Sequence, residues 1–184
     1  MPAKILPRCA RPEKKNWRVR VDQMPVHRET RDLPYSAAQM YALVADVGRY
    51  QEFLPWVVGT RVRSDSETEM LADVLVGFKG LREQFSSRVI KSYNRAIDVD
   101  YLDGPLKQLH NEWRFRPRDG GGCHVDFYVE FTFKNRMFQK LAGQMFAKAL
   151  HKMTSAFVDR AGEIYGTSYS LSSGNSSSSA TSTA

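Results

Sequence analysis

The chain has 184 residues, with 27 Lys and Arg against 20 Asp and Glu, and its charge is unevenly spread. Residues 1–23 carry seven basic and two acidic side chains, residues 167–184 carry none, and residues 24–166 are almost balanced at 20 and 18. This balance argues against a nucleic-acid-binding surface. The two cysteines provide neither a disulfide framework nor a metal site, which fits a reducing compartment.

These compositions divide the chain into three parts. We expect a basic disordered leader at 1–23, one folded domain at 24–166, and a Ser-rich disordered tail at 167–184. The leader suits an import peptide, an arm that touches anionic surfaces, or an extension upstream of Met24. A domain of about 140 residues can bury one core but not two. No apolar stretch approaches the length of a membrane span.

The domain begins with short elements. Residues 26–33 show a mixed pattern that ends like a strand, and Ser36 is a suitable N-cap for a helix over 36–46. Apolar residues of this helix recur at helical spacing on one side, at Met40, Leu43, Val44 and Val47. A second helical turn follows within 50–56 and ends at Pro55.

From there the apolar pattern alternates every second residue, which indicates consecutive antiparallel strands with one apolar face. The expected strands cover residues 72–78, 81–89, 96–102, 109–115 and 124–133. Turn residues separate them at 77–80, 103–105 and 119–122.

A last helix is expected over residues 136–165. Its wide apolar stripe predicts that it covers the apolar face of the sheet, while Lys140, Lys148 and Lys152 lie on its opposite side. The predicted class is α+β, with a curved antiparallel sheet wrapped around a long C-terminal helix.

The sequence offers little material for catalysis. The four histidines are scattered without metal-ligand spacing, and the Gly run at 120–122 is explained by a hairpin loop. On the inward faces of the strands, Ser87 and Asn111 are the main polar residues. We therefore predict no catalytic residues, no metal and no enzyme activity.

The inward faces are instead rich in aromatic rings. These residues would form an ordinary core, or they would line a cavity for a lipid-like ligand, since periodicity does not separate the two. The candidate ligand-binding residues are Phe53, Pro55, Trp56, Val74, Val76, Phe78, Phe85, Trp113, Phe127, Val129, Phe131, Phe133, Phe138, Leu141 and Met145.

Five short strings in order then identify a family. They are LPYS at 33–36, YQEFLPW at 50–56, LREQF at 81–85, DGPLK at 103–107 and WRF at 113–115. Together they resemble the coenzyme Q-binding branch of the START-like, polyketide cyclase/dehydrase superfamily. Some members have Cys where this chain has Val57, so no thiol role is expected there.

The resemblance implies a helix-grip fold and an apolar tunnel for ubiquinone or a similar isoprenoid lipid. It also implies a non-enzymatic carrier in respiration, with ubiquinone as ligand and no cofactor. The protein would be in the bacterial cytoplasm, peripheral to the inner membrane, or on the matrix side in mitochondria. A sister group, described as a ribosome-association toxin, is the alternative; there nucleic acid would be a partner. A cyclase-like enzyme is a further alternative that the apolar faces disfavour. Trp56 after Pro55 favours the quinone branch.

Membrane contact is assigned to Trp56 with Lys140, Lys148 and Lys152. Phe53, Pro55 and Trp56 are candidates for the mouth of the tunnel, because an exposed indole suits a membrane interface. Alternatively these residues pack the first helix onto the sheet, and the three lysines form a solvated face.

Overall fold

The computed structural model describes residues 26–78, 80–134 and 136–166, and gives the backbone alone at Phe78, Leu81, Phe133 and residues 136–147. Its elements are, in chain order, β1 (Val26–Leu33), α1 (Ala37–Ala45), η1 (Val47–Arg49), α2 (Tyr50–Phe53), β2 (Val57–Asp65), β3 (Glu69–Phe78), β4 (Leu81–Ser92), β5 (Ala96–Asp103), β6 (Leu106–Pro117), β7 (Cys123–Phe133) and α3 (Arg136–Tyr165). The leader and the tail predicted from composition lie outside the described residues.

The first helix begins where its N-cap predicts. The Ser36 hydroxyl accepts a hydrogen bond from the Gln39 amide at 3.2 Å, and the Gln39 side chain accepts one from the Ser36 amide at 2.8 Å. This reciprocal capping box satisfies two backbone donors at the helix start. Met40 and Val44 are buried on the inner side of α1, which confirms the predicted apolar side of this helix.

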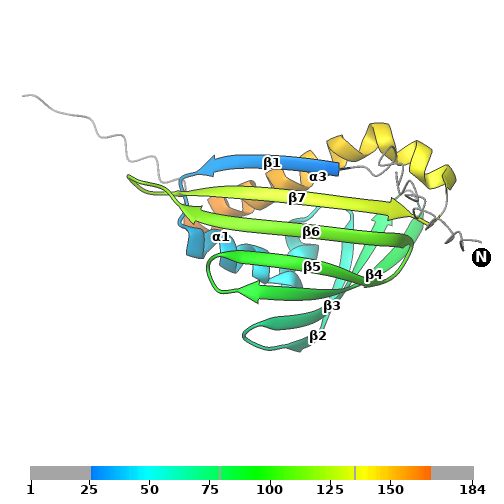
Figure 1. Cartoon of the computed structure of the whole chain (residues 1–184), viewed down its shortest axis with the longest axis horizontal. Coiled ribbons are helices and arrows are strands. Elements are labelled where there is room, and N and C mark those ends of the chain that lie inside the picture. The colour runs from blue at the N-terminus through cyan, green and yellow to red at the C-terminus, as the bar shows by residue number, and fades with distance from the viewer. Residues whose placement is uncertain (1–25, 79, 135, 167–184) are drawn as a thin grey trace, which may run out of the picture.

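Seven antiparallel strands form one sheet in the order β1-β7-β6-β5-β4-β3-β2. Strands β2 to β7 follow one another as hairpins, whereas α1 and α2 carry the chain from one edge of the sheet to the other (Figure 1). All five predicted strands are confirmed, and each is at least as long as expected. In β7 the residues Val125, Phe127, Val129 and Phe131 are buried and alternate with more accessible neighbours, as the pattern predicted.

The sequence pattern missed β2 and did not resolve β1. Both are edge strands, and β2 carries almost no buried residue. Its register shifts twice against β3, between Val57 and Gly59 and between Val62 and Ser64, so no strict alternation runs along it. Irregular, charged edge strands are a common protection against edge-to-edge pairing.

The turn from β6 to β7 requires glycine at Gly122. Its φ is +81°, and a Cβ atom at this position would lie 2.2 Å from the Leu33 carbonyl oxygen. The glycine run is therefore a hairpin turn packed on the end of β1, as predicted.

The long helix α3 has the predicted bounds and covers the concave face of the sheet with its C-terminal half (Figure 1). The ring of Phe157 meets Trp113, Tyr50 and Phe53 at centroid distances of 5.2, 5.3 and 5.2 Å. Helix, sheet and α2 thus share one aromatic cluster. Among the described residues, no helix is long and apolar enough to cross a membrane.

Candidate functional site

The concave face of the sheet has two halves that differ in packing. Beside α1 and the C-terminal half of α3, the side chains of Met40, Trp113, Phe127 and Phe157 are all buried. The gap that remains among them has a volume of about 20 Å³. A water molecule needs roughly 10–15 Å³ of such space, so the gap has room for about one water molecule and for no lipid. These side chains therefore form a packed core, and we call this part of the concave face the filled half.

At the end of β3 to β6 that lies near the β3–β4 and β5–β6 turns, the inward side chains are only half-buried. This open half consists of Val74, Val76, Phe85, Ser87, Val99, Tyr101, Leu109 and Asn111. Six of these eight residues are apolar or aromatic, and they come from four neighbouring strands, β3 to β6. A cluster of half-buried apolar side chains on a concave surface is typical of a ligand site rather than of a closed core.

The candidate ligand-binding residues divide between these regions. Val74, Val76 and Phe85 lie in the open half, whereas Trp113, Phe127, Val129 and Phe131 are buried. Phe78, Phe133, Phe138, Leu141 and Met145 lie outside the described side chains, as does Lys140. Lys148 and Lys152 are exposed on α3. Contact of these lysines with a membrane stays a prediction.

The predicted mouth segment separates into two parts. Phe53 packs against Tyr50 and Phe157, and the Arg160 guanidinium lies 5.7 Å from the centre of its ring, so Phe53 closes the core. Trp56 is half-buried and has a φ of +68°, a conformation that costs a non-glycine residue energy. Its carbonyl oxygen accepts a hydrogen bond from the Gly77 amide at 2.8 Å, which anchors the start of β2 to β3.

A polar seam between β1 and α3 corrects the expectation that Ser87 and Asn111 are the main inward polar residues. The inward side of β1 carries His27, Glu29 and Arg31. Buried Thr154 of α3 donates to Glu29 at 2.9 Å and accepts from Arg31 at 3.0 Å, and Arg31 also contacts Glu29 directly. The alternation in residues 26–33 was hidden because charged residues occupy both sides of this strand.

The electrostatics of the seam favour an ionised Glu29. Burial raises the pKa of Glu29, but hydrogen bonds from Arg31, Thr154 and His27 outweigh burial and hold the pKa below its ordinary value of 4.5. The seam therefore ties the edge strand to α3 through a charged hydrogen-bonded cluster.

Asn111 faces inward as predicted, and its side chain is fixed by two hydrogen bonds. The Asn111 amide nitrogen donates to the Tyr128 carbonyl oxygen at 2.8 Å, and its oxygen accepts from the Trp113 indole nitrogen at 3.0 Å. Asn111 therefore lies where the filled half meets the open half. The hydrogen bond between Asn111 and the Trp113 indole could not be predicted from the sequence, because alternation places every second residue of β6 on the same face without showing which of them are in contact.

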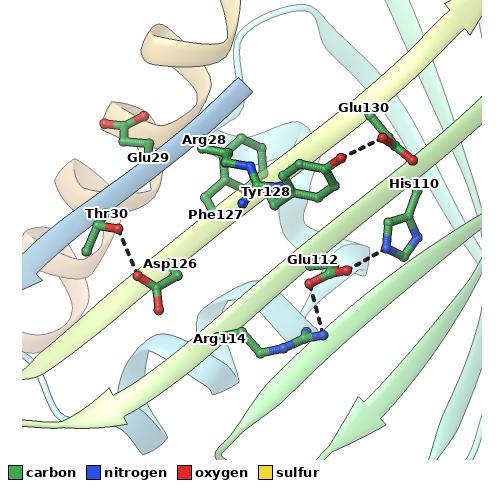
Figure 2. A pocket seen from close by; sticks show the side chains of 10 residues that line it. All are labelled: Arg28, Glu29, Thr30, His110, Glu112, Arg114, Asp126, Phe127, Tyr128 and Glu130. Carbon is green, nitrogen blue, oxygen red and sulfur yellow. Dashed lines mark hydrogen bonds and ion pairs between the residues drawn. The ribbon is translucent and has the colours of Figure 1, made fainter. Parts of the chain in front are cut away.

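The outer face of the sheet carries a second feature, a charged hollow of about 500 Å³ over β1, β7 and β6 (Figure 2). Its cations are paired within the protein: Arg114 contacts Asp98 at 2.7 Å and Glu112 at 3.1 Å. The Arg28 guanidinium lies over the Tyr128 ring at 4.6 Å. A hydrogen bond from His110 holds the pKa of Glu112 below its ordinary value. This hollow provides little free positive charge for phosphate groups.

The described side chains offer few reactive groups. Burial raises the pKa of the Cys123 thiol to about 11, so it is protonated at neutral pH and a poor nucleophile. Among the described residues there is no group of three or more His, Cys, Asp or Glu that could hold a metal ion. The arrangement is suited to holding an apolar molecule.

Comparison with known families agrees with this architecture. Residues 33–158 match the family described as polyketide cyclase / dehydrase and lipid transport. The chain belongs to this START-like family. The match spans the sheet from the end of β1 to β7 and most of α3, so the resemblance seen in the five strings and the predicted α+β fold are confirmed.

Individual relatives differ in name, and two of the names point to different functions. The ribosome association toxin RatA of Escherichia coli is 36% identical over 142 residues, covering 77% of this chain and 90% of that protein. The coenzyme Q-binding protein COQ10 homolog B, mitochondrial, of Xenopus laevis is 34% identical over 142 residues, covering 75% of this chain and 58% of that protein. The solved 18 kDa protein CC1736 of Caulobacter crescentus is 37% identical, with a TM-score of 0.63, covering 77% of this chain and 99% of that one. Identity alone does not separate the two names.

Proposed function

We propose that the chain binds ubiquinone or a similar isoprenoid lipid in the open half and acts as a non-enzymatic carrier that supports respiratory electron transport. The observation that carries this proposal is the contrast between a filled core and a half-buried apolar surface on the same sheet. The relative named for coenzyme Q binding and the family's lipid-transport description support it.

The energetics suit a carrier. Burying apolar surface is worth about 25 cal/mol per Å² against water, but a bilayer already gives an isoprenoid tail that gain. Transfer between bilayer and protein is then close to neutral, so the lipid can be both taken up and released. The selectivity for one lipid over another then depends on the shape of the site and on its few polar groups.

The direct test is extraction of the purified full chain with organic solvent. The extract is expected to show the ultraviolet absorbance of a quinone, and a short-chain ubiquinone added to the protein should raise its melting temperature by ligand linkage. A protein free of lipid that also fails to respond to added quinone would contradict the proposal.

Filling the open half should abolish the site. Leu109→Trp adds a large ring among half-buried inward side chains, and we expect bound quinone to fall at least about tenfold while the protein stays folded. Leu102→Trp makes the same change at an exposed position of β5 and should leave binding intact. Equal retention of quinone by both variants would place the lipid elsewhere.

Trp56 is the proposed membrane contact. Asn tolerates a positive φ, so Trp56→Asn should change the free energy of unfolding by less than about 1 kcal/mol while association with anionic vesicles falls. Flotation with vesicles and urea unfolding measure the two effects. A loss of several kcal/mol with unchanged flotation would make Trp56 a core residue.

Ribosome association is the second candidate function, because several relatives of 32–37% identity are named as ribosome association toxins. It predicts co-sedimentation with ribosomal subunits and slower translation on overexpression. The internal pairing of the cations on the outer face makes that surface a poor phosphate site. Co-sedimentation that survives moderate salt, without any bound lipid, would favour this function over the carrier.

A further inference from the structure

Tyr101 of β5 brings a polar atom into the apolar open half. The pairing of β4 with β5 places it directly opposite Ser87 on the inward face, and its side chain is half-buried. Its hydroxyl oxygen reaches the β5–β6 turn, where it accepts a hydrogen bond from the Leu106 amide at 3.0 Å. The ring therefore belongs to the open half, while the hydroxyl lies at the end of the open half nearest this turn.

The β5–β6 turn holds this hydroxyl in place. A Cβ atom on Gly104 would lie 2.9 Å from the Tyr101 hydroxyl and closer still to the Gln84 carbonyl oxygen, so the turn packs tightly on both. Lys134, which follows β7, donates from its amine to the Gly104 carbonyl oxygen at 2.7 Å and from its amide to the Pro105 carbonyl oxygen at 3.3 Å. The hydroxyl is thus positioned before any ligand arrives.

Two irregularities of the sheet lie in the hairpin that carries Tyr101. The register of β4 against β5 shifts between Ser86 and Ser87, so that β5 carries one extra residue, Leu102. The register of β6 against β7 shifts between Leu106 and Gln108. Bulges of this kind re-aim side chains and are over-represented beside functional sites. Their position favours a functional role for this end of the open half.

The Tyr101 hydroxyl has a hydrogen-bond donor to offer. A phenol has a single O–H donor, and the oxygen is already engaged as the acceptor of the Leu106 amide. Within the part of the chain that the structure describes, the O–H itself has no acceptor. Burial raises the pKa of Tyr101 above its ordinary value of 10.0, and the nearby Asp103 and Glu83 carboxylates raise it further, so the proton stays on the oxygen at neutral pH.

The ligand that fits this arrangement is an apolar molecule with a hydrogen-bond acceptor at one end. We propose that the Tyr101 hydroxyl donates a hydrogen bond to a carbonyl oxygen of a quinone head, with the Leu106 amide positioning the hydroxyl. The quinone ring then lies at the turn end of the open half, near the half-buried side chains of Val76 and Phe85. This inference rests on the proposed function and adds the residue that distinguishes a quinone from a lipid without an acceptor.

The affinities of two ligands for the full-length Tyr101→Phe variant test the assignment. The probes are a short-chain ubiquinone and a benzene ring that carries the same tail but no ring oxygen. Tyr101→Phe should weaken ubiquinone binding about tenfold and binding of the prenylated benzene less than about twofold, because only the quinone accepts from the hydroxyl. The prenylated benzene also controls for the lost bond to the Leu106 amide, since a disturbed turn would weaken both ligands. Tyr93→Phe makes the same change at an exposed position and should alter neither affinity.

A second measurement needs no variant that folds. In the wild-type full chain labelled with ¹⁵N-leucine, ubiquinone should shift the Leu106 amide resonance downfield, because a hydroxyl that donates a hydrogen bond becomes a better acceptor. The prenylated benzene should shift this resonance much less. If Tyr101→Phe does not fold, this comparison decides the assignment.

Three outcomes would count against these ideas. Unchanged ubiquinone affinity in Tyr101→Phe, or equal weakening of both ligands, would overturn the role of Tyr101 while lipid binding stands. Saturable binding of ubiquinone that leaves the Leu106 resonance unmoved would do the same. Failure of both ligands to bind the wild-type protein would contradict the proposed function itself.

Discussion

Replacing Phe157 by Ala is expected to lower the free energy of unfolding by about 3–5 kcal/mol. The ring is 3% exposed and contacts Trp113, Tyr50 and Phe53, so its removal leaves a cavity at the junction of α3, α2 and the sheet. Tyr50 and Phe53 contact each other on α2, and Trp113 is fixed on β6, which limits how far these neighbours can collapse into the space. Urea unfolding followed by circular dichroism measures the loss.

Phe85→Ala is the matched control in the open half. Phe85 is half-buried, so its truncation should cost about 1–2 kcal/mol, since part of the ring is already accessible in the folded state. The same substitution should reduce bound quinone, whereas Phe157→Ala should leave quinone binding largely unchanged under folding conditions. Equal losses of stability at the two positions would mean that one continuous core fills the whole concave face.

The fold was largely predictable because most elements obey one period each. In β7 the buried set from Val125 to Phe131 alternates without interruption, since this strand lies between two neighbours and one of its faces is covered throughout. The Ser36 cap and the apolar stripe of α3 are equally local signals. Such signals can be read from the sequence because they arise within one helix or strand and do not depend on which other element packs against it.

The candidate site was less predictable, because its properties depend on pairs of elements. Nothing in the sequence says that the charged strand β1 lies beside α3, so the inward position of Glu29 and its bond to Thr154 could not be foreseen. Periodicity also assigns Trp113 and Leu109 to the same face of β6 without revealing that one is buried and the other half-buried. The difference arises from which part of α1 and α3 stands opposite each residue.

The polar seam between β1 and α3 lies next to the aromatic cluster around Phe157. Thr154 lies one helical turn before Phe157, so the hydrogen bonds of the seam and the aromatic cluster act on the same stretch of α3. The edge strand β1 contributes little apolar surface on its inward side, and polar contacts to Thr154 and His151 take that place. Stability of the β1–α3 contact should therefore depend on charge.

Glu29→Ala is expected to cost about 2–3 kcal/mol at neutral pH, because it removes a carboxylate that accepts from Arg31 and Thr154 and leaves the Arg31 charge partly buried. Glu69→Ala, which removes an exposed partner of Arg88, should cost less than about 1 kcal/mol.

The cost of removing Glu29 should also depend on pH. The pKa of Glu29 is lower in the folded protein than its ordinary value of 4.5, so its ionised form stabilises the fold. This contribution is fully present above pH 4.5 and is lost as the pH falls through the lowered folded pKa. The difference in unfolding free energy between wild type and Glu29→Gln should therefore be constant from neutral pH down to about pH 5 and should shrink below 4.5. A difference that instead grows in acid would mean that burial, which raises the pKa, outweighs the hydrogen bonds of the seam.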